Sequence, residues 1–156
     1  MSVVTQTRGL GAVPPTWRSV PRAAVWLGFA GAVPFAGLAL MSFASGWPGL
    51  LALSALSAYA VAILSFMGGI QWGMAMDRDS SPVRLAASVV PALVAWAGFL
   101  LGGRPGLWLL AAAFAGLLAY DLHTVRTGAA PSWYPHLRWP LTAIVVVCLL
   151  VASVNA

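Results

Sequence analysis

The sequence is poor in ionisable residues, and this scarcity excludes a soluble domain. It contains no Lys and no Glu, and only 7% of its 156 residues are charged, whereas soluble domains carry about 25%. So few polar groups cannot cover a globular surface in water. Intrinsic disorder is excluded for the opposite reason, because 61% of the residues are hydrophobic and disordered chains are poor in apolar residues. The composition therefore indicates an integral membrane protein.

Cysteine and catalytic motifs are also scarce. Cys148 is the single cysteine, which excludes an internal disulfide and a multi-cysteine metal site. The chain has no Gly-rich phosphate loop, no HExxH and no Ser/His/Asp motif context, so we expect no enzyme. His123 and His136 flank one connection, but two histidines without a third ligand make a weak metal site. We therefore predict no metal and no cofactor.

Long apolar runs are what the chain does have. Five segments approach or exceed the roughly 20 residues that a helix needs to cross a bilayer. They lie at about 23–43, 50–76, 83–101, 107–122 and 141–154. We therefore predict an all-α integral membrane protein with five transmembrane helices. Residues 23–156 form the membrane domain, and residues 1–22, which contain three prolines, form a mobile N-terminal tail.

The eight arginines predict how the helices are oriented. They stand singly or in pairs between the apolar segments and form no basic stripe, so nucleic acid is not an expected partner. Positive charge concentrates on the cytoplasmic side of membrane proteins. A cytoplasmic N-terminus leaves only Arg104 on the far side of the membrane. The distribution therefore predicts a cytoplasmic N-terminus and a periplasmic C-terminus.

Asp121 follows the fourth apolar run. An ionised carboxylate in hydrocarbon is costly unless it is paired, and the C-terminus of a helix is an unfavourable position for an anion. We therefore expect an arginine partner, with Arg138 first and Arg126 second. Two interpretations stay open, namely a structural ion pair and a carboxylate that binds a ligand or carries protons.

Gln71 lies near the inner end of the second span and needs hydrogen-bond partners there. It either joins two helices or contacts a ligand, and Gly68 and Gly69 leave space beside it for either role. A binding site of this kind predicts a cavity that opens inward next to the two glycines.

Aromatic residues gather near the same predicted interface. An aromatic belt at the headgroups explains them, and an aromatic-walled pocket for a flat hydrophobic ligand is the alternative. Thr142 opens the fifth helix beside them. The complete candidate binding set is Gly68, Gly69, Gln71, Trp72, Asp121, Trp133, Tyr134, Arg138 and Thr142. On the predicted topology all of these residues lie on the cytoplasmic side.

Two motifs carry a resemblance to a known family. Residues 63–73 read ILSFMGGIQWG, and residues 131–142 hold PSWY followed by Leu137-Arg138 and Leu141-Thr142. Together they resemble the domain of unknown function 3429 family, which includes the transmembrane protein 69 group, over about residues 25–155. The resemblance implies a small inner-membrane protein with five helices and supplies no established activity. A histidine is common in the family where this chain has Gln71, so no imidazole chemistry is expected there.

Three functions are consistent with the sequence. The leading hypothesis is a non-enzymatic binding or accessory subunit in a bacterial inner membrane, partnered by the lipid bilayer and by a membrane protein or a second copy of the chain. The alternative is a carrier or sensor that holds a porphyrin, a quinone or a lipid between its helices. A proton or ion pathway through Asp121 is third, because no row of polar residues runs from face to face.

Overall fold

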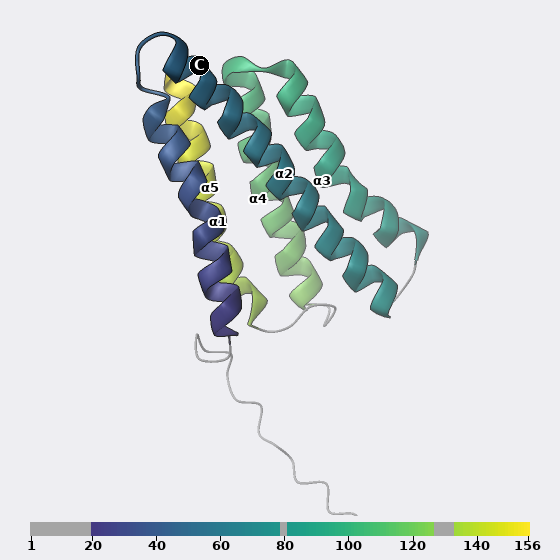
Figure 1. Ribbon diagram of the computed structural model, residues 1–156. Coiled ribbons are helices and arrows are strands. Elements are labelled where there is room, and N and C mark those ends of the chain that lie inside the picture. The colour runs from purple at the N-terminus through teal and green to yellow at the C-terminus, as the bar shows by residue number, and fades with distance from the viewer. Residues whose placement is uncertain (1–19, 79–80, 127–132) are drawn as a thin grey trace, which may run out of the picture.

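The computed structural model describes residues 20–78, 81–126 and 133–156. The predicted tail at 1–22 falls almost entirely outside these residues, as do Pro131 and Ser132. The described chain is helical, with five long helices that run up and down in turn (Figure 1). They are α1 (Arg22–Met41), α2 (Trp47–Arg78), α3 (Pro82–Leu101), α4 (Gly103–Arg126) and α5 (Tyr134–Ala152), followed by a short 3-10 turn, η2 (Ser153–Asn155).

All five helices are long and apolar enough to cross a membrane. Their outer faces carry large apolar side chains such as Trp26, Val83 and Trp96, which are well exposed. A soluble protein does not present an apolar surface of this extent, but hydrocarbon accommodates it. The prediction of an all-α protein with five transmembrane helices is confirmed.

The helices form a closed ring in chain order. Each packs against the next, α5 returns to pack against α1, and α2 also touches α4 across the middle. The site end of the bundle, as we use the term, is the end where α1, α3 and α5 begin and α2 and α4 finish. The opposite end carries the C-terminus, which lies near the start of α2 (Figure 1).

Aromatic residues from three helices fill the centre of the core. Phe35 of α1 meets Phe114 of α4 edge-on at 5.9 Å between ring centroids, and it packs against Tyr59 of α2 at 5.0 Å. The Tyr59 hydroxyl donates a 3.0 Å hydrogen bond to the backbone carbonyl of Gly31. This bond joins α2 to the backbone of α1 in the turn before Pro34, whose missing N–H leaves the neighbouring carbonyl of Ala30 without its usual helical partner.

Glycines allow two pairs of helices to approach closely. A side chain at Gly68 would place its Cβ 2.6 Å from the backbone oxygen of Ser88, so α2 and α3 touch there through their backbones. The same holds for α3 and α4, because a Cβ at Gly106 would lie 2.4 Å from the oxygen of Gly98. Small residues at such crossings strengthen packing in a bilayer, where no hydrophobic effect drives helices together.

The opposite end is tied by hydrogen bonds to the last residues of the chain. Arg104 donates from Nε to the carbonyl of Ser153 at 2.9 Å and from Nη2 to the carbonyl of Val154 at 3.2 Å. The indole of Trp108 donates to the Ser153 hydroxyl at 3.1 Å. Side chains at the start of α4 thereby bind carbonyls of η2, just after the end of α5, where backbone carbonyls have no partner within the helix.

All five helices begin earlier than the sequence predicts, and the difference is largest for α4 and α5. α4 begins at Gly103 rather than at Leu107, and α5 begins at Tyr134 rather than at Leu141. Pro105 and Pro135 stand in the first turns of these helices, where a proline is favoured because an N–H there has no helical partner. α5 also continues through Pro140. Prolines that suggested connections in the sequence are therefore parts of helices.

Candidate functional site

A buried ion pair joins α4 to α5 near the site end. Arg138 donates from Nε to Oδ2 of Asp121 at 2.6 Å, and the two side chains are only 7% and 2% exposed. The expected pairing is therefore present, and Arg126 is exposed at the end of α4 instead. Asp121 lies inside α4 and not after its end, so the carboxylate depends on Arg138 for compensation.

Gln71 adds a third helix to this pair. Its side-chain amide is buried and donates from Nε2 to Oδ1 of Asp121. Both carboxylate oxygens of Asp121 are thus engaged, one by α2 and one by α5. We call Gln71, Asp121 and Arg138 the polar cluster. Its formal charges cancel, which suits a group buried in an apolar bundle.

The polar cluster leaves part of Arg138 unsatisfied. A guanidinium carries five N–H donors. Within the described residues, Nη1 of Arg138 donates to the sulfur of Met67 at 2.9 Å, and a thioether sulfur is a weak acceptor. Nη2 is buried and has no hydrogen-bond partner among the described residues. The cluster therefore holds a donor that the described protein does not use.

Thr142 presents a second unused polar group one helical turn after Arg138. Its side chain is buried, and Oγ1 meets no hydrogen-bond partner within the described part of the chain. A threonine hydroxyl in a helix usually donates to the carbonyl one turn back, and here it does not. Residues four apart lie on one face of a helix, so both unused groups occupy the same face of α5.

A pocket of about 120 Å³ adjoins that face of α5. Its walls come from α1, α2, α4 and α5, and they are almost entirely apolar. Arg138 and Thr142 are the only polar side chains among the described residues that line it. The other lining residues are Leu27, Gly28, Gly31, Ala32, Phe35, Ile63, Phe66, Met67, Phe114, Leu141 and Val145.

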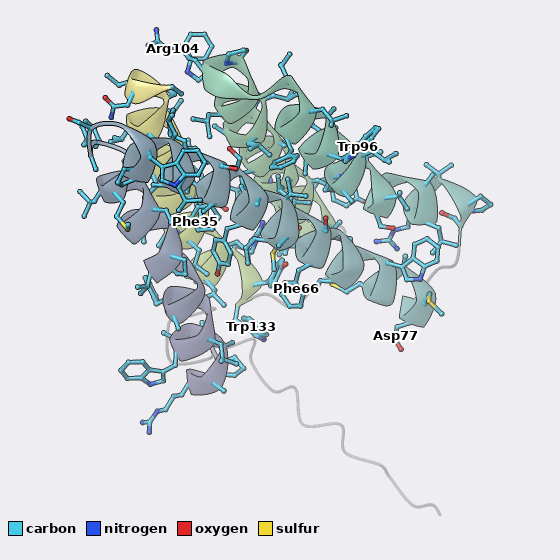
Figure 2. The ribbon with its side chains drawn as sticks, turned by 45° about the horizontal axis from the view of Figure 1, so that its top comes forward. Phe35, Phe66, Asp77, Trp96, Arg104 and Trp133 are labelled. Carbon is cyan, nitrogen blue, oxygen red and sulfur yellow. The ribbon has the colours of Figure 1, made fainter. Side chains whose placement is uncertain are left out.

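The pocket opens sideways, towards the surroundings of the bundle. Phe35 and Phe114 form its deep wall and are almost fully buried, whereas Leu27 and Phe66 are 74% and 62% exposed. Phe66 extends from α2 (Figure 2), whereas Phe35 is only 1% exposed. α1 and α2 diverge towards the site end (Figure 1). The mouth therefore lies between two membrane-spanning helices and faces lipid.

The two glycines beside Gln71 do not form a cavity of the kind expected. Gly68 packs against the backbone of α3, and Gly69 faces open space, where a Cβ would have no neighbouring atom within 4 Å. The pocket instead adjoins another face of α2, which carries Ile63, Phe66 and Met67. The pocket therefore lies on a different face of α2 from the one expected, which was the face beside Gly68 and Gly69.

The aromatic candidates lie apart from the pocket. Trp72 is 43% exposed, and Trp133 meets Tyr134 edge-on at 6.0 Å at the start of α5. Neither Trp133 nor Tyr134 lines the pocket, although Tyr134 is close enough to Asp121 and Arg138 to interact with their charges. Their position at a helix end suits the interfacial aromatic belt that was one of the two interpretations.

α1 supplies the part of the site that sequence reasoning missed. Gly28, Gly31, Ala32 and Phe35 line the pocket, but none carries a polar group that marks a site. The small residues at a spacing of four, Gly28 and Ala32, are the one available signal, and such rows ordinarily indicate close helix packing. In the described part of the chain, no three His, Cys, Asp or Glu residues lie close enough to hold a metal ion.

The comparisons with known proteins agree with this architecture. The chain is 33% identical over 145 residues to transmembrane protein 69 of Xenopus tropicalis, covering 89% of this chain and 56% of the frog protein. It is 28% identical over 155 residues to transmembrane protein 69 of Mus musculus, covering 91% of this chain and 62% of the mouse protein. The chain thus spans less than two thirds of these curated relatives.

No solved structure matches the chain. A family model, described as a protein of unknown function, DUF3429, matches residues 20–154 and so includes every residue of the polar cluster and the pocket. The chain therefore belongs to the DUF3429 family of transmembrane proteins.

Proposed function

We propose that this protein is a non-enzymatic membrane protein that binds a small hydrophobic molecule between α1, α2 and α5. One observation carries the proposal: Arg138 and Thr142 line an apolar pocket, and each has a buried polar atom without a hydrogen-bond partner among the described residues. Leaving a buried donor unsatisfied costs about 1–3 kcal/mol. A bound molecule with a hydrogen-bond acceptor offsets that cost.

The pocket favours a binding role over the other two functions. An accessory subunit that acts only as a scaffold needs a filled bundle, and it gains nothing from an apolar pocket with unused donors. A proton pathway needs polar groups beyond Asp121. The core between the polar cluster and the opposite end is apolar, with Leu56, Leu110 and Leu149 fully buried.

The size of the pocket limits which hydrophobic ligand it can hold. A cavity of about 150 Å³ holds a benzene molecule, and this pocket measures about 120 Å³. A porphyrin is far larger, so it is not the proposed ligand. The location that goes with this function is the cytoplasmic membrane of a bacterium, with the polar cluster on the cytoplasmic side, and the arginine distribution supports it.

Filling the pocket tests the proposal. Ala32 is buried and lines the pocket, and Ala36 lies one turn further along α1 on an exposed face. We expect Ala32→Leu to displace the ligand and to leave the fold intact, because the added atoms enter existing space. Ala36→Leu is the matched control, since it adds the same atoms to a surface that faces lipid.

The measurement is the small-molecule content of protein purified in mild detergent, determined by mass spectrometry. Wild type and Ala36→Leu should carry the same hydrophobic compound. Ala32→Leu should carry at least about tenfold less, which corresponds to about 1.4 kcal/mol of binding free energy. Equal content in both variants, or a wild type that carries no compound, contradicts a binding role for this pocket.

A further inference from the structure

The chemistry of the pocket narrows the ligand to one class. We infer that it is a neutral ring that carries a carbonyl oxygen, of the quinone type, with a hydrocarbon tail that leaves through the mouth between α1 and α2. This inference rests on the proposed function and adds the identity of the group that enters the pocket.

The available space is about that of one ring. The pocket measures about 120 Å³, close to the volume of about 150 Å³ that holds a benzene molecule. Its deep wall is formed by Phe35 and Phe114, whose rings meet edge-on. Aromatic rings favour offset or edge-on contacts with one another, so a flat ring suits this wall better than a branched or saturated group.

The unused polar groups require an acceptor on that ring. Nη2 of Arg138 is a donor that can never accept, and the hydroxyl of Thr142 can also donate. Both groups belong to one face of α5 and both residues line the pocket. A carbonyl oxygen has two lone pairs, so a single carbonyl can satisfy either or both. A purely hydrocarbon ligand leaves both groups unsatisfied.

The charge of the polar cluster requires that the acceptor be neutral. Arg138 is already compensated by Asp121 at 2.6 Å. A ligand carboxylate next to this neutral pair leaves one uncompensated negative charge in an apolar site, close to the carboxylate of Asp121. Such a charge is costly in hydrocarbon, and like charges in one buried site repel each other. A neutral carbonyl receives the same hydrogen bonds without this cost.

The mouth accounts for the rest of the molecule. Leu27 and Phe66 at the rim are exposed on the face that meets lipid. A tail attached to the ring passes between them into the bilayer and stays in hydrocarbon along its whole length. The ligand therefore enters from the membrane, ring first, and needs no opening to water.

Three probes that share one tail separate these arguments. They are decylbenzoquinone, with neutral carbonyls; decylbenzene, with no acceptor; and decylbenzoate, with an anionic acceptor. Binding of each to the full-length protein in detergent is measured as the bound fraction in native mass spectrometry. We expect the benzoquinone to bind at least about tenfold more tightly than either of the other two, equal to about 1.4 kcal/mol.

A matched pair of variants assigns the preference to the pocket. Thr142→Val keeps the shape of the side chain and removes only its hydroxyl, which has no partner among the described residues, so the fold should be retained. We expect it to lower the affinity for decylbenzoquinone severalfold and to leave decylbenzene unchanged. Ser57→Ala removes a hydroxyl of α2 that already donates to Leu53, outside the pocket, and should change neither affinity.

The outcomes that overturn this inference differ from those that overturn the proposed function. Equal or tighter binding of decylbenzoate refutes a neutral ligand, and equal binding of decylbenzene refutes any use of Arg138 and Thr142. In both cases a pocket that binds molecules from the bilayer still stands. If none of the three probes binds, a ring with a carbonyl is refuted. The proposed function is then decided independently, by comparing the small-molecule content of purified Ala32→Leu with that of Ala36→Leu.

Discussion

Arg138 has an established structural role and a proposed binding role, and these involve different nitrogens. Nε forms the ion pair between α4 and α5, while Nη2 has no hydrogen-bond partner among the described residues and is the donor of the proposed site. The same side chain thus stabilises the bundle and contributes to the candidate binding site. The first role can be measured without any knowledge of the ligand.

Replacing Arg138 with Leu should strongly lower the yield of folded protein and its melting temperature. Asp121 is then a buried carboxylate with no cation, and breaking a buried pair in this way costs about 3–5 kcal/mol. Thermal unfolding in detergent, followed by circular dichroism, provides the measurement. Arg126→Leu, at an exposed position, should melt like wild type.

A double variant shows whether the charge causes the loss. Asp121→Leu combined with Arg138→Leu removes both partners, and replacing a whole buried pair with apolar residues is often close to neutral. The double variant should therefore recover much of the stability that Arg138→Leu loses. Wild-type melting of Arg138→Leu alone is the result that speaks against a stabilising pair.

Among the helices, the contact between α2 and α3 depends on which face of α2 is turned towards α3. Gly68 is pressed against the backbone of α3 at Ser88, and its neighbour Gly69 meets nothing. The two glycines are adjacent and look equivalent in the sequence, but a rotation of about 100° per residue separates their surroundings completely.

Alanine at these two positions should give opposite results. Gly68→Ala should lower the melting temperature, because the new Cβ pushes α2 from α3 and overpacking costs about 1–3 kcal/mol. Gly69→Ala should leave it unchanged or raise it, since alanine favours a helix over glycine by roughly 0.5–1 kcal/mol. Melting of both variants in one detergent is the comparison. A stable Gly68→Ala protein means that α2 and α3 are not in backbone contact.

The sequence predicts those features that depend on local composition. Five apolar runs are visible without any knowledge of packing, and with so few ionisable groups the carboxylate of Asp121 has few possible partners. Gln71 is different, because it meets Asp121 from 50 positions away. That contact depends on how α2 crosses α4, which hydrophobicity alone does not determine.

The pocket could not be predicted from the sequence, because it also depends on how the helices cross. Its apolar lining consists of residue types found along every helix, and only the angle between α1 and α2 leaves space among them. Thr142 was selected from the sequence, but its unused hydroxyl becomes evident only when its neighbours are placed. The helix starts were misplaced because a proline in a first turn looks like a helix breaker when the turn itself is unknown.

At the scale of the whole molecule, the charges lie unevenly along the bundle. Arg22, Arg84 and Arg126 are all at the site end. Arg104 is at the opposite end, as Figure 2 shows. Because the helices alternate in direction, this asymmetry follows directly from the chain order. It favours a bundle whose site end faces the cytoplasm.

Cysteine labelling in intact bacterial cells tests that orientation. In a Cys148→Ala background, Ser45→Cys places a thiol in the exposed connection between α1 and α2, and Asp77→Cys places one at the exposed end of α2. A maleimide that does not cross membranes should label Ser45→Cys from outside, and should label Asp77→Cys only after the membrane is opened. The reverse pattern means that the site end faces outward.

Because the mouth of the pocket opens sideways, the concentration that matters for binding is the one in the membrane and not the one in water. A site that opens to water fills according to the aqueous concentration of its ligand, but this mouth lies between the exposed side chains of Leu27 and Phe66. A ligand of the proposed kind would therefore exchange with molecules dissolved in the bilayer, and its share of the surrounding lipid would set the bound fraction. Extra lipid would dilute such a ligand while the volume of the surrounding water would have little effect, so the proposed function makes binding depend on the composition of the membrane.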